Sequence, residues 1–177
     1  KALRESMQKV MRLYPVTEEH IMRYASGAAG LYSVHIMSAL CDLGYADGVY
    51  GTLYQKLLGP KTGICFVPHE YEDVWEVAKQ IKSAGGICVL AHPSNYQSIG
   101  IMQQLAAEGL LDGIERYHPK VKQEDIPIIE QTIEKYGLIA TGGTDFHGKN
   151  ASKPNPLGTC LTMQESLERL FKLAKSK

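Results

Sequence analysis

The chain has 177 residues and a mass of 19.6 kDa, a length that predicts one domain or one domain with a small second one. Apolar residues make up 44% of it, enough for a core, and 19 basic residues balance 19 acidic ones. A net charge of zero weighs against sequence-independent binding to nucleic acid. The sequence contains no apolar run of about 18 residues, so no membrane span is expected.

The N-terminal residues are polar and do not resemble a signal peptide. Four cysteines lie far apart in the sequence, without a CxxC pair: Cys41, Cys65, Cys88 and Cys160. In a chain of this size without a signal, they predict reduced, mostly buried thiols and a cytoplasmic protein. The first residue is Lys rather than Met, so we expect the chain to be part of a longer one.

Residues 1–62 are expected to form a small all-helical domain. Apolar residues at helical spacing predict a first helix over residues 3–14, which stops before Pro15. Thr17 followed by two glutamates predicts an N-cap and a second helix to about Ala29. Two further helices are expected, one with Ser33 as its N-cap and its end at Gly44, and a short one over residues 52–59.

Residues 63–177 are expected to form an α/β domain with parallel strands, because strand and helix patterns alternate there. Strands are predicted at 87–91, 112–117 and 138–141, with a further candidate at 156–162. Helices are predicted at 72–86, 98–109, 125–137 and 164–175. So few units do not close an eight-stranded barrel of about 250 residues. The pattern therefore predicts an open sheet or part of a barrel.

Each of the three clear strands ends in polar residues with metal-binding side chains: His92, then Glu115 and His118, then Asp145 and His147. The carboxyl ends of parallel strands share one edge of a sheet, so all five are expected to face one crevice. Imidazoles and carboxylates suit zinc, manganese or iron. Each of these motifs alone is common in loops. The presence of such motifs at three successive strand ends favours a metal-binding site.

Asp145 and His147 are two residues apart, so on an extended segment both side chains point to the same side. That spacing allows one carboxylate and one imidazole to share a metal ion. Gly142 and Gly143 precede them and permit unusual backbone angles.

Three segments resemble the later motifs of the PHP (polymerase and histidinol phosphatase) family of metal-dependent phosphoesterases. They are GGICVLAHPSNY (85–96), LLDGIERYHP (110–119) and YGLIATGGTDFHG (136–148). The resemblance covers nearly the whole chain and is strongest to the subgroup of nucleoside 3′,5′-bisphosphate phosphatases and related RNases. It implies a helical insertion domain at 1–62, followed at 63–177 by the C-terminal part of a distorted (β/α)7 barrel.

The resemblance also implies roles for single residues. His92 would be a metal ligand or a phosphate contact, and Asp145 and His147 would be ligands in a centre of two or three divalent metal ions (Mn, Zn or Fe). His92 or His147 would also act in catalysis. Glu115 and His118 would support this centre. The segment Ser33-Val34-His35-Ile36-Met37 matches a motif of the helical insertion, which makes His35 a candidate for substrate binding together with Asn95 and Arg116.

The chain departs from the family pattern in three places. No HxH motif, with which the family's ligand set opens, occurs anywhere in it. Asn95 stands where close relatives often carry a phosphate-binding arginine, which Arg116 or Lys149 would have to replace. Ser33-Val34 stands where arginine-proline is usual. The last two changes weaken the expectation of a bisphosphate nucleotide as substrate.

The resulting hypothesis is a hydrolase that cleaves a phosphate ester of a nucleotide, a short RNA or another small molecule. This chain would be an incomplete portion of the catalytic domain, with weak or no activity alone. The alternative is a metal-poor binding module without turnover. Because a partial barrel leaves strand edges unpaired, we expect self-association or pairing with a missing N-terminal half.

Overall fold

The computed structural model describes residues 1–150 and 155–176, which divide into two compact units. The first contains residues 1–71 and 147–150, and the second contains residues 72–146 and 155–176. The predicted domain boundary after residue 62 lies a short way before this division. No helix in the described part of the chain combines the length and the apolar character that a membrane crossing needs.

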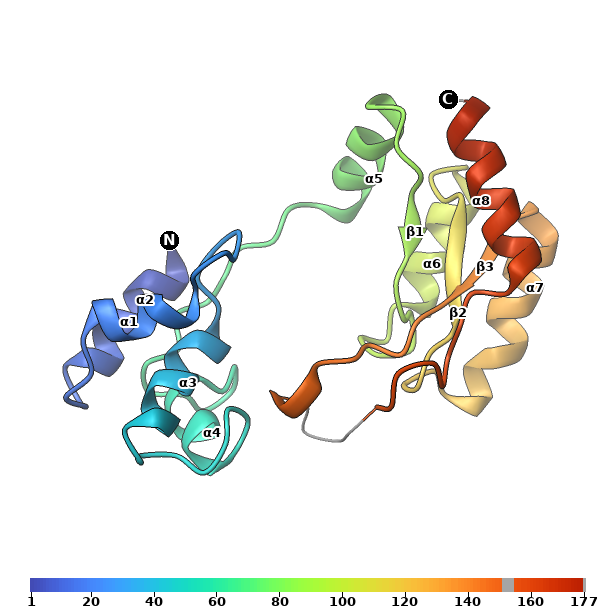
Figure 1. Cartoon of the computed structure of the whole chain (residues 1–177). Coiled ribbons are helices and arrows are strands. Elements are labelled where there is room, and N and C mark those ends of the chain that lie inside the picture. Colours follow the sequence, from blue (N-terminus) through green and yellow to red (C-terminus); the bar gives the residue numbers. More distant parts are fainter. Residues whose placement is uncertain (151–154, 177) are drawn as a thin grey trace. The chain divides into compact units, whose positions relative to one another are not determined.

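The first unit is helical: Figure 1 shows its α-helices in blue to cyan and its short 3₁₀ turn in orange. Its helices are α1 (Ala2–Met11), α2 (Glu18–Tyr24), α3 (Ser33–Asp42) and α4 (Thr52–Leu58), with a short 3₁₀ turn, η2, at Gly148–Asn150. They enclose a core of apolar side chains drawn from all four helices, among them Val10, Ile21, Ile36, Leu40 and Leu57.

Local signals explain where these helices begin and end. The Thr17 hydroxyl accepts a hydrogen bond from the backbone N–H of His20 (3.1 Å), so Thr17 caps α2 as predicted. The helix stops at Tyr24 rather than at Ala29, and the left-handed Gly27 (φ 78°) follows in the connection. Tyr32, not Ser33, is the N-cap of α3.

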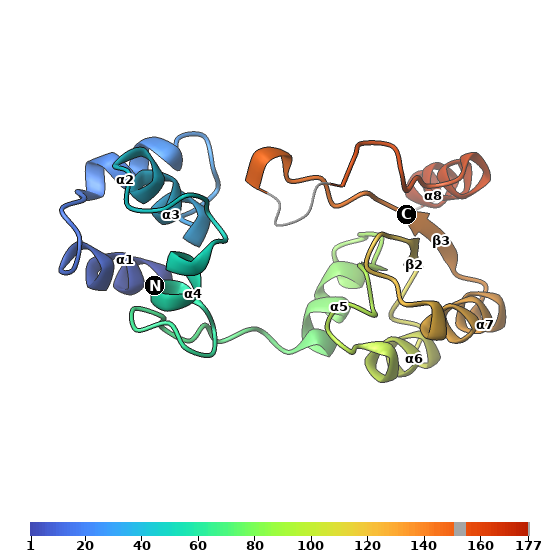
Figure 2. The same ribbon diagram turned by 90° about the horizontal axis from the view of Figure 1, so that it is seen from below.

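The second unit alternates helices and strands. Its elements are α5 (Val74–Ser83), β1 (Val89–Leu90), α6 (Ile99–Ala107), β2 (Gly113–Tyr117), the 3₁₀ turn η1 (Gln123–Asp125), α7 (Ile126–Tyr136), β3 (Ile139–Gly142) and α8 (Gln164–Ser176). Figure 2 shows α5, α6 and α7 gathered on one side of the sheet and α8 apart from them, beside β3.

The three strands form one parallel sheet in the order β1-β2-β3. Gly113 of β2 aligns with Val89 of β1 and with Ile139 of β3. Buried side chains of the sheet and of α5, α6 and α7 form the core, among them Ala78, Met102, Leu105, Ile114 and Ile129. The predicted α/β class with parallel strands is confirmed.

The fourth candidate strand, at 156–162, is wrong: these residues form turns and irregular structure. The physical reason lies in Thr162. Its hydroxyl accepts from the backbone N–H of Gly142 (3.0 Å) and donates to the carbonyl of the same residue (3.0 Å). A side chain therefore uses the groups at the end of β3 that a neighbouring strand would need.

Candidate functional site

The loops that follow β1, β2 and β3 carry most of the predicted metal-site residues at the carboxyl edge of the sheet, and Glu115 lies within β2. Two of these residues have left-handed backbones that residues with a Cβ rarely adopt: His92 (φ 30°) after β1 and Asp145 (φ 52°) after β3. Such a conformation costs about 1–3 kcal/mol and persists where the surrounding structure enforces it, often at functional sites.

Glu115 of β2 connects the loops after β1 and β3. One carboxylate oxygen accepts the backbone N–H of His92 at 2.8 Å. The other lies 2.8 Å from the position that a Cβ on Gly143 would occupy. Glycine at position 143 therefore leaves the room that this carboxylate fills.

Two imidazoles meet at this edge. The ring centroids of His92 and His118 are 5.1 Å apart, and the ring of Tyr96 lies 5.8 Å from that of His92. His92 Nδ1 and His118 Nε2 are both buried without a hydrogen-bond partner. Buried polar atoms are normally satisfied, so two such nitrogens on neighbouring rings indicate a place where something binds.

His118 is held in one orientation by its own loop. The backbone N–H of Lys120 donates to His118 Nδ1 at 3.1 Å, and the side chain is only 1% exposed. Burial lowers the pKa of His118, and the neighbouring His92 acts in the same direction, whereas the carboxylates of Glu115 and Asp145 oppose them. The ring is therefore favoured in its neutral form.

Asp145 lies beside His118, with 3.8 Å between its Oδ2 and Nε2 of the histidine. The ammonium group of Lys120 contacts the same oxygen at 3.1 Å. Sequence reasoning missed Lys120, although a basic residue directly after the Tyr-His-Pro motif was a usable signal. It also missed Ser94, whose buried hydroxyl accepts from the backbone N–H of Lys122 (3.3 Å).

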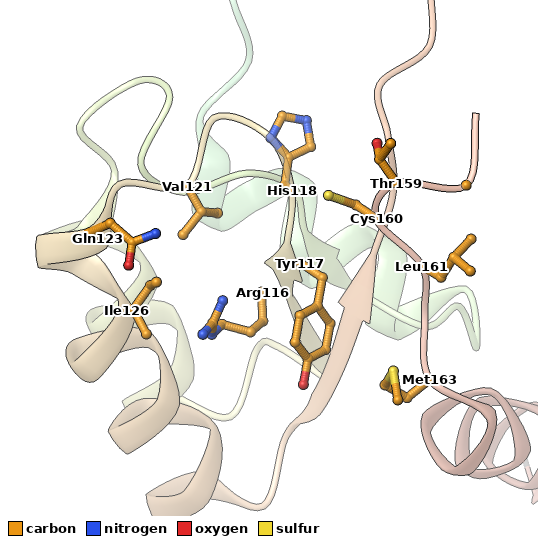
Figure 3. A pocket seen from close by; sticks show the side chains of 11 residues that line it. Arg116, Tyr117, His118, Val121, Gln123, Ile126, Thr159, Cys160, Leu161 and Met163 are labelled. Atoms are coloured by element: carbon orange, nitrogen blue, oxygen red, sulfur yellow. The ribbon is translucent and has the colours of Figure 1, made fainter. Parts of the chain in front are cut away.

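Arg116 follows Glu115 on β2, at an irregularity of the strand, and makes different contacts. Its guanidinium group donates to a carboxylate oxygen of Glu130 on α7 (2.9 and 3.0 Å) and lies 5.3 Å from the ring centre of Tyr117. It lines a pocket of about 400 Å³, and Figure 3 shows that its side chain and that of Tyr117 point away from His118.

The other candidates for substrate binding lie elsewhere. Asn95 is half-buried in the loop after β1, where its backbone N–H donates to the carbonyl of His92 (2.9 Å). His35 belongs to the helical unit. Its Nδ1 accepts the backbone N–H of Tyr32 (3.2 Å), and it lines a cavity of about 580 Å³ there.

The structure thus brings together His92, Glu115, His118 and Asp145. His147 is exposed and opens the short segment that groups with the helical unit, so its convergence with the other candidate ligands stays a prediction. The side chain of Lys149 lies outside the described residues.

The unpartnered nitrogen of His92 and the Asp145 carboxylate are suitable metal-ligand types. Within residues 1–150 and 155–176, however, no group of three or more His, Cys, Asp or Glu side chains is arranged to hold a metal ion. The described residues therefore fit part of a metal site, without a complete ligand set.

Comparison with curated proteins identifies relatives in two bacteria. The chain is 34% identical over 142 residues to a phosphoribosyl 1,2-cyclic phosphate 1,2-diphosphodiesterase from Eggerthella lenta, covering 80% of the chain and 53% of that protein. It is 29% identical over 134 residues to a 3′,5′-nucleoside bisphosphate phosphatase from Chromobacterium violaceum, covering 71% and 45%. The chain is a homologue of phosphoesterases. It spans about half the length of these relatives, and the predicted resemblance is confirmed.

Solved structures agree on the fold. A crystal structure from Bifidobacterium adolescentis, provisionally described as a metal-dependent phosphoesterase, matches 97% of the chain and 61% of its own length (TM-score 0.83, 23% identity). An amidohydrolase from Chromobacterium violaceum, with bound sulfate and no metal, matches 86% and 62% (TM-score 0.54, 23% identity). No family profile matches the chain.

Proposed function

We propose that this chain is the C-terminal part of a metal-dependent phosphoesterase that hydrolyses a small phosphate ester. The observation that carries the proposal is the pair of buried, unpartnered imidazole nitrogens of His92 and His118 beside Asp145. They lie at the carboxyl edge of a parallel sheet, where α/β enzymes assemble their sites, in a homologue of phosphoesterases.

In this proposal His92, Asp145 and His147 hold divalent metal ions, two or three in the complete site, with Mn, Zn or Fe as candidates. A bound divalent ion lowers the pKa of a water ligand and neutralises charge on phosphoryl oxygens. The remaining ligands come from a portion of the enzyme that this chain does not contain. That portion also supplies the strands that complete a PHP-type barrel, with residues 1–62 as its helical insertion.

The substrate class follows from the relatives, whose names specify a phosphoribosyl cyclic phosphate and a nucleoside bisphosphate. A small phosphorylated compound related to nucleotides is therefore the proposed substrate, and short RNA is a second candidate. His35 and Asn95 are proposed to contact it. Arg116 remains a weaker candidate, because Glu130 already occupies its guanidinium group. The cytoplasm is the proposed location.

The decisive experiment uses the complete protein from the natural reading frame. Hydrolysis of bis(p-nitrophenyl) phosphate and of a nucleoside 3′,5′-bisphosphate is measured with Mn²⁺, Zn²⁺ or Fe²⁺ and again after chelation. We expect chelation to abolish turnover. We expect His92→Ala to reduce turnover by about 100-fold or more. Even the loss of a residue that only hydrogen-bonds to a metal ligand lowers activity or metal affinity by about 10- to 100-fold. The matched control is His69→Ala, at an exposed histidine of the helical unit.

The second candidate function, a binding module without turnover, is favoured by the lack of a complete ligand set among the described residues. The same assay separates the two. Turnover that persists after chelation contradicts metal dependence. No turnover in the complete protein with any of the three metals favours the binding module.

A further inference from the structure

We infer that His118 is a hydrogen-bond donor to a phosphoryl oxygen of the substrate, through Nε2–H of its neutral ring. This inference rests on the proposed function only in naming a phosphoryl group as the acceptor. The donor itself is argued from the contacts of His118, which differ from those expected of a metal ligand.

The tautomer follows from a single contact. The backbone N–H of Lys120 lies 3.1 Å from His118 Nδ1, and a backbone N–H only donates. Nδ1 must therefore carry a lone pair. A neutral imidazole has one protonated nitrogen, so the hydrogen is on Nε2. Protonation of Nδ1 would set two donors against each other, which adds to the burial that already disfavours the charged ring.

The Nε2–H group has no acceptor among the described residues. The nearest candidate, Asp145 Oδ2, is 3.8 Å away, which is too far for a hydrogen bond. That oxygen also lies 3.1 Å from the ammonium group of Lys120. A buried donor without an acceptor is costly, so its presence at the edge of the candidate site is best explained by an acceptor that arrives with the ligand.

The surroundings suit an anionic acceptor. Lys120 brings a positive charge near His118 through its contact with Asp145. A neutral N–H donor leaves no unpaired buried charge when the ligand departs. The Asp145 carboxylate opposes an anion at this point. In the proposed enzyme that carboxylate is a metal ligand, which leaves His118 and Lys120 to face the phosphoryl oxygens.

The first test measures the tautomer in the unmodified 177-residue chain. Long-range ¹H–¹⁵N correlation spectra distinguish Nε2–H from Nδ1–H imidazoles. We expect His118 to show the Nε2–H pattern at neutral pH, and we expect added inorganic phosphate to shift its Nε2 resonance. An Nδ1–H pattern, or an Nε2 resonance that phosphate leaves unchanged, overturns the inference.

The second test uses two variants that separate the nitrogens. In His118→Asn the amide reaches only the Nδ1 position, whereas in His118→Gln it extends to the Nε2 position. We expect phosphate to bind about 10-fold or more weakly to His118→Asn, because hydrogen bonds to charged groups are the stronger ones. His118→Gln should retain most of the affinity. The control is His69→Asn. Equal affinity of the two His118 variants overturns the inference. If either variant fails to fold, the spectra of the unmodified chain are the deciding measurement.

Failure of the inference and failure of the proposed function are distinguishable. If the complete protein hydrolyses phosphate esters while His118 carries its hydrogen on Nδ1, the function stands and this role for His118 is wrong. If the complete protein has no activity while phosphate shifts the Nε2 resonance, the donor stands and the catalytic function is wrong.

Discussion

A hydrogen bond to Glu115 offsets the energetic cost of the left-handed backbone at His92. A left-handed backbone at a residue with a Cβ costs about 1–3 kcal/mol. A hydrogen bond to a charged acceptor contributes about 1.5–3 kcal/mol, so the 2.8 Å contact between the His92 N–H and the Glu115 carboxylate is large enough to offset that cost. The position of the His92 imidazole therefore depends on a carboxylate from the neighbouring strand.

Replacement of Glu115 tests this dependence. We expect Glu115→Ala to lower the free energy of unfolding by about 1.5–3 kcal/mol and to accelerate hydrogen exchange at the His92 amide, because that N–H loses its acceptor. Glu115→Gln keeps an oxygen in the same place and should preserve protection of the amide. Denaturant titration and amide exchange give the two readings. Unchanged exchange at His92 in Glu115→Ala would show that the contact does not hold this loop.

Gly143 provides a complementary test from the third strand end. A Cβ there would lie 2.8 Å from the Glu115 carboxylate, whereas one on Gly100, in α6, meets nothing within 4 Å. We expect Gly143→Ala to displace the carboxylate and reduce stability by about 1 kcal/mol, with faster exchange at His92. Gly100→Ala should be neutral or stabilising by about 0.5–1 kcal/mol. Equal effects of the two changes would contradict a specific role for Gly143.

At the level of elements, helix ends that are marked by capping residues or glycine were predicted well. Thr17 caps α2, and α7 ends at Gly137 with a left-handed backbone (φ 64°), because such positions depend on neighbours in the sequence. The strand predicted at 87–91 is ordered into a ladder only at Val89–Leu90. Side chains take the backbone N–H groups on either side of it: the Asp112 carboxylate accepts that of Cys88 (2.8 Å), and the Glu115 carboxylate accepts that of His92 (2.8 Å). Sequence periodicity does not predict contacts with residues so far along the chain.

The candidate site shows the same limit. His92, Glu115, His118 and Asp145 were predicted to meet because parallel strands share a carboxyl edge, which is a rule of topology. The orientation of His118 was not predictable, since it depends on the backbone of Lys120. The grouping of His147 with the helical unit depends on contacts between residues far apart in the sequence.

In the helical unit, α2 and α3 are joined by His20 and Asp42, with 2.9 Å between the ring nitrogen and the carboxylate. The hydrogen bond from His20, followed by that from Tyr24, lowers the pKa of Asp42 below its ordinary value of 3.8. A carboxyl group whose pKa is depressed by folding stabilises the fold above its unfolded pKa. That contribution is lost as the pH falls through the lower, folded pKa.

We therefore expect the helical unit to lose stability in acid, below about pH 4, and Asp42→Asn to reduce this pH dependence. Amide exchange in α2 and α3 is the appropriate measurement, because Trp75, the single tryptophan, reports on the other unit. Asp47→Asn, at an exposed carboxylate of the same unit, is the control. An acid response in Asp42→Asn identical to that of the unmodified chain would exclude the His20–Asp42 pair as its source.

At the scale of the whole molecule, the chain spans about half the length of its curated relatives, and its site lacks a complete ligand set among the described residues. We expect the 177-residue chain alone to hydrolyse p-nitrophenyl phosphate only weakly with Mn²⁺, because the sequence contains no HxH motif. Turnover by the purified chain at a rate typical of enzymes, about 1 s⁻¹ or more, would show that the described residues suffice.

The surface around α8 exposes large apolar side chains. This amphipathic helix has no buried residue, and Leu161, Met163 and Phe171 are 61%, 57% and 61% exposed. In the part of the chain that the structure describes, the sheet beside α8 has three strands, and the edge strand β1 exposes Val89 (36%). Open strand edges and clustered apolar side chains favour association.

We expect the isolated chain to form dimers or larger assemblies at micromolar concentration, measured by size-exclusion chromatography with light scattering. Phe171→Asp should shift the population toward monomer, because a charge in the contact would have to be desolvated. Leu13→Asp is the matched control, since Leu13 is 54% exposed in the helical unit. If both variants and the unmodified chain elute as monomers, the surface around α8 is stable in water. The expectation that the sheet requires additional strands is then wrong.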